Sequence, residues 1–503
     1  MCRFGPPVER HPPLSPPSNQ SVLPLRGQLR VVMYAWVFGA AWMWAVQGVA
    51  LNRYARSLGM PDWAFGLLGA LPYAGALFQL PASYYLERYG HRRRVFLIDM
   101  TISRLSWTAL ALIPWVMPDM RAWWWPVMLI WVAFASITAF VGVPAWMGWM
   151  SDIIPSRVRG RFFARRQRMG FAVGIVISLS IAWIMAIIEQ TAGPDGVPSQ
   201  AITLQLTSIT IAIAGLVGTL DILAFRHVRD DQPPTPKGQV NLLSHLAEPL
   251  RDRNYLVFLA HTFVYVLSIG FLGQYIWLYI LEVVKISYWE ANLYILVVPM
   301  GLAIVAYAGW GRAIDRLGKQ PVMVICSAVV FAGGAGWAIT GPGDLFWPGY
   351  IIAMTAALAH PGIELARINI VLDQAGTRRG RTGGSAYVAL NGIVWAAAGV
   401  VSGGFGSLIA STFTDWTYTV SAFNLTLTYH HLLFAASALF RLPLIPLALM
   451  LREPRATGTR DAIKYMTGVV YSNMREAVGI PLRAAGRVTR LAYRLNPPRR
   501  RRP

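Results

Sequence analysis

The residues best suited to chemistry lie in an otherwise apolar stretch at positions 347–372. His360, Glu364 and Arg367 follow one another at intervals of four and three residues, so a helix would place all three on one face. A carboxyl group in apolar surroundings favours its protonated form, whereas a guanidinium one turn away favours the carboxylate. This competition could link proton binding at Glu364 to binding of a solute. The same pair could instead be a fixed ion pair that stabilises a helix bundle, and the sequence leaves both interpretations open.

Polar groups in two other apolar stretches are weaker candidates for the same site. His261, Tyr265 and Gln274 lie in the seventh apolar stretch of the chain, and Gln47 lies in the first. Polar side chains inside a membrane are costly, so each is a candidate for contact with a ligand. For His261 and Gln47, hydrogen-bonded packing is the favoured interpretation.

The pattern of nucleophiles and metal ligands argues against an enzyme. The sequence has no His-Glu-x-x-His, no Gly-x-Ser-x-Gly and no phosphate-binding loop. Cys2 lies in a polar segment and Cys326 in a distant apolar one, so neither a disulfide nor a metal site is indicated. The adjacent His430 and His431 have no partner motif. We therefore expect no catalytic residue, no bound metal and no cofactor.

The elements that must position these residues are membrane-spanning helices. Of the 503 residues, 55% are hydrophobic and only 14% are charged, against about 25% charged residues in a typical soluble protein. A helix needs about 20 apolar residues to cross a hydrocarbon core about 30 Å thick. This criterion predicts an all-α integral membrane protein with twelve transmembrane helices, at 29–51, 64–85, 95–117, 123–150, 170–188, 202–225, 255–281, 291–310, 321–340, 347–372, 385–409 and 432–451.

The distribution of arginine and lysine predicts how these helices are oriented. The formal net charge of +22 would suit a nucleic-acid-binding protein, but the basic residues are confined to alternate loops and the C-terminal tail. The opposite loops hold only Arg53, Arg56, Arg121 and Lys285. Cytoplasmic loops of membrane proteins are rich in arginine and lysine. We therefore expect an inner-membrane protein with both termini in the cytoplasm and no nucleic-acid partner.

A long hydrophilic loop divides the chain into two halves. Residues 226–254 are predicted to be a cytoplasmic central loop between one six-helix half, 28–225, and another, 255–451. The proline-rich segment 1–27 is predicted to be a disordered cytoplasmic N-terminus. The basic cytoplasmic tail, 452–503, is predicted to be either disordered or an amphipathic helix on anionic lipid.

Short motifs recur at corresponding loops of the two halves. Glu87-Arg88-Tyr89-Gly90-His91-Arg92 follows the second predicted helix, and Asp315-Arg316-Leu317-Gly318-Lys319-Gln320 follows the eighth. Arg159-Gly160-Arg161 follows the fourth helix, and Arg379-Gly380-Arg381 follows the tenth. A tight turn needs a residue that tolerates a positive φ, which explains Gly90 and Gly318. Such repetition predicts an internal duplication of one six-helix unit.

The loops after the second and eighth helices resemble the signature loop of the major facilitator superfamily, G-x-x-x-D-R-x-G-R-K. The second copy, which starts at Gly311, fits at nearly every position. The first departs from the pattern with Ser83 for glycine, Glu87 for aspartate and His91 for the first basic residue. The resemblance covers residues 29–451 and implies two pseudo-symmetric halves with a cytoplasmic gate. The residues of that gate would be Glu87, Arg88, Gly90, Arg92, Gly311, Asp315, Arg316 and Gly318.

The resemblance also implies a function. Members of this family are secondary transporters that move a small solute by alternating access, and the binding site lies between the halves near the bilayer midplane. The candidate substrate or coupling residues are Glu364, Arg367, His360, His261, Gln274 and Gln47. We expect a monomer in contact with membrane lipid, a small solute and a coupling proton. Two alternatives stay open: a transporter-like assembly factor or sensor and, less favoured, a membrane-embedded enzyme.

Overall fold

The computed structural model describes most of the chain. The described residues are 25–154, 156–191, 199–229, 249–273, 275–341, 348–377, 384–421 and 425–453. Most of the predicted disordered N-terminus, much of the central loop, Gln274, the second Arg-Gly-Arg motif and nearly all of the basic tail lie outside the described residues.

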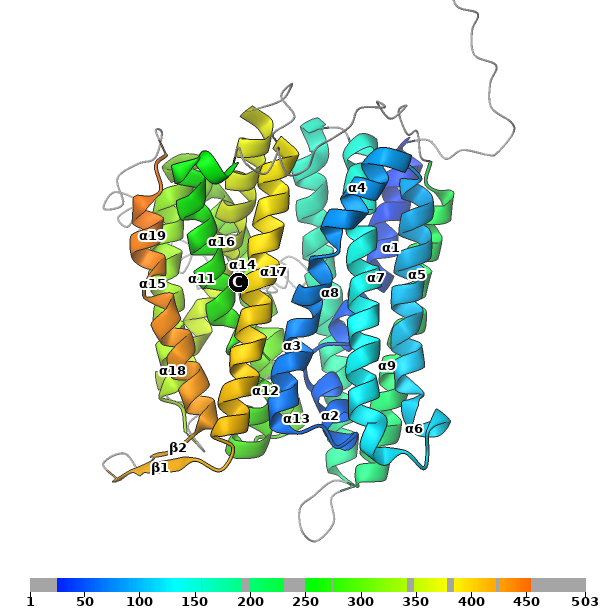
Figure 1. The fold of residues 1–503 in the computed structure, drawn as a ribbon, viewed down its shortest axis with the longest axis vertical. Coiled ribbons are helices and arrows are strands. Elements are labelled where there is room, and N and C mark those ends of the chain that lie inside the picture. The colour runs from blue at the N-terminus through cyan, green and yellow to red at the C-terminus, as the bar shows by residue number, and fades with distance from the viewer. Residues whose placement is uncertain are drawn as a thin grey trace, which may run out of the picture.

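The described part is built almost entirely from helices (Figure 1). The first half contains α1 (Leu25–Ala45), α2 (Val49–Ser57), α3 (Asp62–Ala76), α4 (Gln79–Tyr89), α5 (Arg92–Ala111), α6 (Ile113–Val116), η1 (Arg121–Trp123), α7 (Trp124–Ile153), α8 (Ser156–Glu189), α9 (Gln200–Ala224) and η2 (Phe225–His227). The second half contains α11 (Arg253–Gly270), α12 (Tyr275–Leu278), η3 (Tyr279–Val284), α13 (Tyr288–Asn292), η4 (Leu293–Val297), α14 (Val298–Leu317), α15 (Lys319–Ala338), α16 (Pro348–Thr377), α17 (Gly384–Thr412), α18 (Tyr429–Arg441) and α19 (Leu444–Met450).

These helices agree with the predicted membrane architecture. Each of the twelve predicted segments overlaps one helix or consecutive helices of the structure, and several segment ends differ by one or two residues from the helix ends. Among the described residues, nine segments are long and apolar enough to cross a membrane, and a tenth is added if α1 and α2 form one bent span. The two remaining predicted segments correspond to α5 and α16, which carry charged residues within their length.

The first predicted helix is wrong in its bounds. The helix begins at Leu25, inside the segment predicted to be disordered, and it breaks before α2, which extends to Ser57 in the predicted outer loop. The two pieces are bent by 47°. Gly48 at the break has a φ of 72°, and a Cβ there would lie 2.9 Å from side-chain atoms of Trp277 and Leu296. Glycine is therefore required both by the backbone conformation and by the close approach of the second half.

A second correction concerns the arginine-rich segment before the fifth predicted helix. The helix was predicted to start at position 170, but α8 begins at Ser156. The hydropathy criterion stops where the arginines begin, whereas arginine forms helices nearly as readily as leucine. The arginines at 165, 166 and 168 are consequently held on a rigid helix and not in a loop.

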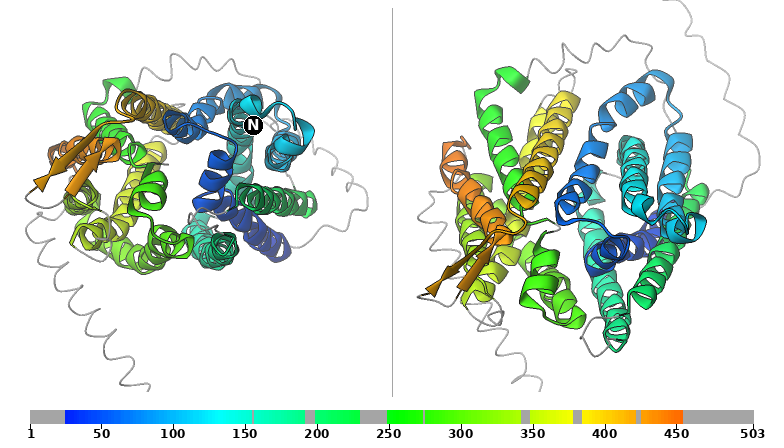
Figure 2. Two further views of the ribbon diagram at one scale, coloured as in Figure 1. Left: turned by 90° about the horizontal axis from the view of Figure 1, so that it is seen from below. Right: turned by 60° about the horizontal axis from the view of Figure 1, so that its bottom comes forward.

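The two halves form bundles that lie side by side, as the view along the helices shows (Figure 2, left). We call the end where α4 meets α5 and α14 meets α15 the arginine-rich end, and it is uppermost in Figure 1. The opposite end carries α2, α6, α13 and a β-ribbon, and we call it the ribbon end. The ribbon is an exception to the all-α prediction: β1 (Thr417–Val420) pairs antiparallel with β2 (Leu425–Thr428) within a segment predicted to be a loop.

Packing joins the halves along particular helices. In the described residues α3 lies against α17, and α8 lies against α13 and α14. The main buried cluster runs through both halves, from Val49 and Phe65 in the first to Tyr275 and Trp277 in the second. A second cluster around Trp149 contains residues of the first half alone. The hydrophobic core is thus shared between the halves in one region and separate in another.

Candidate functional site

Glu364 and Arg367 form an ion pair within α16. The Nη1 atom of Arg367 donates to Oε1 of Glu364 over 2.7 Å. At 1.5 Å per residue, Glu364 lies about 20 Å from the end of the helix at Thr377, far from either terminus. The side chain of Arg367 is 8% exposed, whereas that of Glu364 is 39% exposed. The carboxylate is therefore the accessible member of the pair, and the guanidinium is the buried one.

The side chain of Tyr265 on α11 contacts two residues on the polar face of α16. Its hydroxyl lies 2.8 Å from Nδ1 of His360. The guanidinium carbon of Arg367 lies 5.8 Å from the centre of the same ring, a geometry that allows cation–π attraction. Tyr265 is only 2% exposed. His360 and Arg367 are therefore both in contact with one side chain from a second helix.

The ion pair faces residues of both halves. Tyr73 on α3 and Tyr307 on α14 lie within electrostatic reach of Glu364. Tyr73 contacts Trp395 of α17 with ring centres 4.5 Å apart, and Tyr307 contacts Phe171 of α8 at 6.0 Å. Each of these aromatic pairs joins one half to the other. A half-exposed carboxylate among aromatic rings can bind a cationic group or exchange a proton.

The other predicted site residues lie elsewhere. His261 is fully buried, and its Nε2 atom lies 3.1 Å from the hydroxyl of Ser327 on α15. Gln47 is exposed at the break between α1 and α2, and Gln274 lies outside the described residues. Among the described residues, no group of three His, Cys, Asp or Glu side chains is arranged to hold a metal ion.

The signature loops form two equivalent turns. Gly90 has a φ of 72° and Gly318 a φ of 95°, so both glycines adopt the positive φ expected of them, and His91 follows Gly90 with a φ of 58°. Arg92 at the start of α5 is buried, whereas Arg88 is exposed and donates to the Tyr84 hydroxyl over 3.2 Å.

The charged residues of the second signature loop at the end of α14 are exposed. Asp315 and Arg316 are exposed at the end of α14, and a Cβ at Gly311 would meet no atom within 4 Å. Among the described residues Asp315 makes no ion pair. The side chain of Glu87 lies outside the described part. In this conformation Asp315 therefore does not link the two halves.

Lys319, at the start of α15, is the most connected residue of this loop. Its ammonium pairs with Asp373 of α16 and lies 3.5 Å from Glu453, which follows α19. Glu453 also accepts from the backbone N–H groups of Lys319 and Gln320 at 2.8 and 2.9 Å. A carboxylate at this position satisfies free donors at a helix N-terminus. The loop thereby ties three helices of the second half together.

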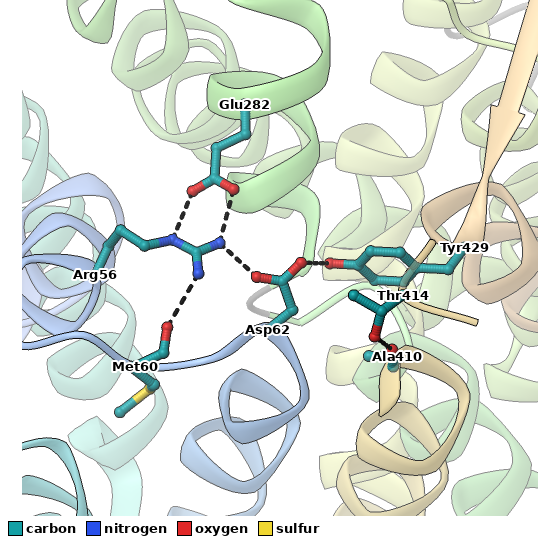
Figure 3. A network of polar contacts seen from close by, with 7 residues as sticks. All are labelled: Arg56, Met60, Asp62, Glu282, Ala410, Thr414 and Tyr429. Atoms are coloured by element: carbon teal, nitrogen blue, oxygen red, sulfur yellow. Dashed lines mark hydrogen bonds and ion pairs between the residues drawn. The ribbon is translucent and has the colours of Figure 1, made fainter. Parts of the chain in front are cut away.

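A polar network at the ribbon end joins the halves (Figure 3). Arg56 donates from Nε and Nη2 to the two carboxylate oxygens of Glu282, over 2.8 and 2.7 Å. Its Nη2 also lies 2.6 Å from Asp62, whose second oxygen accepts from the Tyr429 hydroxyl over 2.6 Å. We call Arg56, Asp62, Glu282 and Tyr429 the ribbon-end network. It connects α2 and α3 of the first half with η3 and α18 of the second.

Glycines allow the halves to approach closely beside this network. A Cβ at Gly403 of α17 would lie 2.4 Å from Cβ of Ala70 and 2.6 Å from the carbonyl oxygen of Gly66, both on α3. A Cβ at Gly399 would lie 1.9 Å from the ring of Tyr73. In contrast, a Cβ at Gly404 would meet no atom within 4 Å. The α3–α17 contact thus depends on particular glycines and has no room for larger side chains.

Sequence reasoning missed the ribbon-end network. In the sequence, Arg56 stands out only as one of few basic residues on the predicted outer side, and no pattern singles out Asp62, Glu282 or Tyr429. Each is one polar residue near the end of an apolar segment. The four come from distant parts of the chain, so no local spacing connects them.

The sequence matches a protein-family model over most of its length. The model for the major facilitator superfamily matches residues 33–403, which is most of the sequence. The protein belongs to the major facilitator superfamily. It is accordingly a transmembrane secondary transporter of a small solute, and the apolar spans of its described residues are consistent with the predicted twelve-helix fold of this family.

Solved structures of similar fold support this assignment. A mutant of the nucleoside transporter NupG matches with a TM-score of 0.58 at 12% identity, over 86% of this chain and 100% of that one. A bacterial homologue of the iron transporter ferroportin, in an inward-facing state, matches with a TM-score of 0.57 at 12% identity, over 85% and 99%. A bacterial homologue of the human lysosomal transporter Spinster, inward-facing and unoccupied, matches with a TM-score of 0.52 at 14% identity, over 85% and 94%. No curated protein matches the sequence.

Proposed function

We propose that this transporter binds its solute or a coupling proton at Glu364, with Arg367, Tyr265 and His360 as supporting groups. The observation that carries the proposal is the unequal exposure of the ion pair. Glu364 is 39% exposed and Arg367 8% exposed, so a ligand can reach the carboxylate while the guanidinium stays packed. A purely structural pair gains nothing from an accessible carboxylate.

The ligand that suits this environment is a proton or a cationic group. The carboxylate supplies one negative charge, and Tyr73 and Tyr307 on two other helices lie within electrostatic reach of it. Protonation of Glu364 would release Arg367 from its ion pair, and a positively charged solute would compete with the guanidinium for the same oxygens. Either event changes the net charge at this ion pair, and it shifts the conformational equilibrium when the two conformations differ in affinity for the ligand.

We further propose that the conformation is closed at the ribbon end and open towards the arginine-rich end. The polar contacts between the halves in the described residues lie at the ribbon end, in the ribbon-end network and where Glu189 accepts from the backbone N–H of Tyr288. Asp315 at the opposite end is exposed. Two of the similar solved structures are described as inward-facing. With the arginine-rich end in the cytoplasm, the conformation would be inward-facing.

The test of the site uses Glu364→Gln in proteoliposomes. A thermal-shift screen of the purified protein against metabolites supplies the ligand, and uptake of that ligand is then measured. We expect the variant to keep its fold and to lose concentrative uptake, because the amide cannot carry a proton or balance a cation. Asp373→Asn is the matched control, since Asp373 is a carboxylate on the same helix at the arginine-rich end.

Two results would contradict the proposed site. Normal concentrative uptake by Glu364→Gln would exclude a coupling or binding role for the carboxylate. A variant that fails to fold would show that the pair is structural, because removing one partner of a buried pair leaves an unbalanced charge that costs about 3–5 kcal/mol.

Orientation needs its own experiment. A single cysteine at Tyr418 of β1, which is 59% exposed, should react with a membrane-impermeant maleimide added to intact cells. A cysteine at Arg312, exposed near the arginine-rich end of α14, should react only after the membrane is opened. The reverse pattern would contradict the placement of both termini in the cytoplasm of an inner-membrane protein. The monomeric state and the binding of anionic lipid by the basic tail stay predictions.

A further inference from the structure

One arginine of α8 differs from its neighbours. Arg165 and Arg168 are exposed, as expected for a positively charged membrane boundary, whereas Arg166 is half-buried. It is the second residue of the apolar span Arg165–Glu189, so it lies where the membrane begins at the arginine-rich end. Partial burial of a guanidinium at this membrane boundary costs desolvation free energy, whereas a solvent-exposed arginine stays hydrated.

Two tryptophans from two other helices enclose this guanidinium. Its central carbon lies 3.7 Å from the ring centre of Trp36 on α1 and 4.9 Å from that of Trp146 on α7. Ring faces at these distances attract a guanidinium and fix its plane. Arg166 of α8 is thus held in a defined orientation by side chains of α1 and α7.

No protein anion in the described residues pairs directly with Arg166. Among the described residues, Asp221 of α9 is the carboxylate whose charge acts on both Arg166 and Arg104. Neither arginine forms an ion pair with Asp221 within 4.0 Å. The guanidinium of Arg104 instead lies 3.4 Å from the ring centre of Trp42. Among the described residues of this region, two cations therefore share one carboxylate, which leaves an excess of positive charge.

We call Trp36, Trp42, Arg104, Arg166 and Asp221 the Arg166 cluster. Its buried polar atoms that lack a hydrogen-bond partner are mostly donors. Four buried nitrogens carry an N–H without a hydrogen-bond acceptor among the described residues: Nε of Arg166 and Arg104, and Nε1 of Trp36 and Trp42. Only one acceptor, Oδ1 of Asp221, is unmatched in the same way. Buried donors normally have partners. A negatively charged group that accepts hydrogen bonds would satisfy the donors without partners and would also balance the excess positive charge.

We propose that Arg166, with Trp36 and Trp146, binds an oxyanion, either a carboxylate or a phosphate, at the arginine-rich end of the first half. The planar fork of a guanidinium matches the paired oxygens of these groups, and charge-assisted hydrogen bonds of this kind are strong. The site is separate from Glu364, which offers the opposite charge on the second half. It goes beyond the proposed transport role and does not depend on it.

Asp221 of α9 lies close to α1 at Gly39. A Cβ at Gly39 of α1 would lie 2.3 Å from Oδ2 of Asp221 and 3.1 Å from the ring of Trp36. The absence of a side chain at Gly39 is what lets the carboxylate and the indole lie together. Asp221 offsets part of the positive charge, so that Arg104 can stay buried and Arg166 half-buried before an anion arrives.

The test measures binding of inorganic phosphate to the full-length protein in a neutral maltoside detergent by titration calorimetry. We expect Arg166→Gln to weaken phosphate binding by about tenfold or more, because charge-assisted hydrogen bonds are lost. Arg166→Lys should also bind more weakly than the native protein, because it keeps the charge and loses the fork. Arg165→Gln is the matched control and should bind as the native protein does. Melting temperatures of all variants establish that they are folded.

A second arm distinguishes a free solute from a lipid headgroup. Native protein and Arg166→Gln are reconstituted in nanodiscs that contain phosphatidylcholine and phosphatidylglycerol, and the lipid retained after delipidation is measured by mass spectrometry. Phosphatidylglycerol retention that depends on Arg166, without phosphate binding in detergent, would identify a lipid phosphate as the oxyanion. Phosphate binding that depends on Arg166, without such retention, would identify a free solute. Equal behaviour of native protein and Arg166→Gln in both arms would overturn the proposal.

Discussion

Glu282→Gln should weaken the closure of the ribbon end. Glu282 contributes the one carboxylate of the second half to the ribbon-end network, and both its oxygens accept from Arg56. The amide keeps the size of the side chain but loses its charge and one of its two acceptors. Arg56 keeps Asp62 and the carbonyl of Met60, which accepts over 3.0 Å, so the variant does not leave the guanidinium without partners.

The expected magnitude follows from the exposure of the pair. Arg56 is 29% exposed and Glu282 is 33% exposed, so the pair lies between a surface ion pair and a buried one. Surface pairs contribute about 0.2–1 kcal/mol, and hydrogen bonds to charged groups about 1.5–3 kcal/mol. A loss of about 1–2 kcal/mol is therefore reasonable, which changes the ratio of closed to open forms by about 5–30-fold.

Double electron–electron resonance measures this ratio directly. Spin labels at Met120 of the first half and Tyr418 of the second are both on exposed side chains near the ribbon end, in a background with Cys2 and Cys326 replaced. We expect the short-distance population to fall in Glu282→Gln in favour of longer distances.

The control is an acid-to-amide change at the same end of the molecule, outside the ribbon-end network. Asp415→Asn makes the same acid-to-amide change at an exposed position near the ribbon end, where the described residues include no ion-pair partner, and it should leave the distances unchanged. An unchanged distribution in Glu282→Gln would show that apolar packing alone closes this end. The ribbon-end network would then be an ordinary surface cluster.

Two further substitutions test contacts that the fold depends on. Gly403→Ala should destabilise the α3–α17 contact by about 1–3 kcal/mol, because its methyl group would overlap Ala70, and the melting temperature should fall; Gly404→Ala has open space and should melt like the native protein. Glu453→Gln should lower the melting temperature slightly, because the amide pairs less strongly with Lys319 and with the N-terminal donors of α15. A Gly403→Ala variant as stable as Gly404→Ala, or no change in Glu453→Gln, would contradict these assignments.

Much of the architecture follows from local sequence. Hydropathy locates the membrane segments because a helix in lipid must satisfy its own backbone and cover itself with apolar side chains. Gly90 and Gly318 could be placed in tight turns because few other residues adopt a positive φ without strain. The contact between Glu364 and Arg367 follows from their spacing of three on one helix.

The remaining features depend on information that no single segment contains. The ribbon-end network joins residues of four segments, and each looks alone like one polar residue at a membrane boundary. The inward position of Arg166 could not be separated from that of Arg165, because both belong to one run of basic residues. Only the tertiary contacts of Trp36 on α1 and Trp146 on α7 place two tryptophans beside one arginine of α8, while the other arginine stays exposed.

Counterflow in proteoliposomes is the most direct test of transport itself. Vesicles that contain the protein are preloaded with an unlabelled ligand from the thermal-shift screen and diluted into a trace of the same ligand in labelled form. Alternating access predicts transient accumulation of label inside, absent from protein-free vesicles, because one site exchanges ligand between the two sides. Binding of the labelled ligand without any entry into the vesicles would contradict transport and would favour a sensor or assembly factor built on a transporter fold.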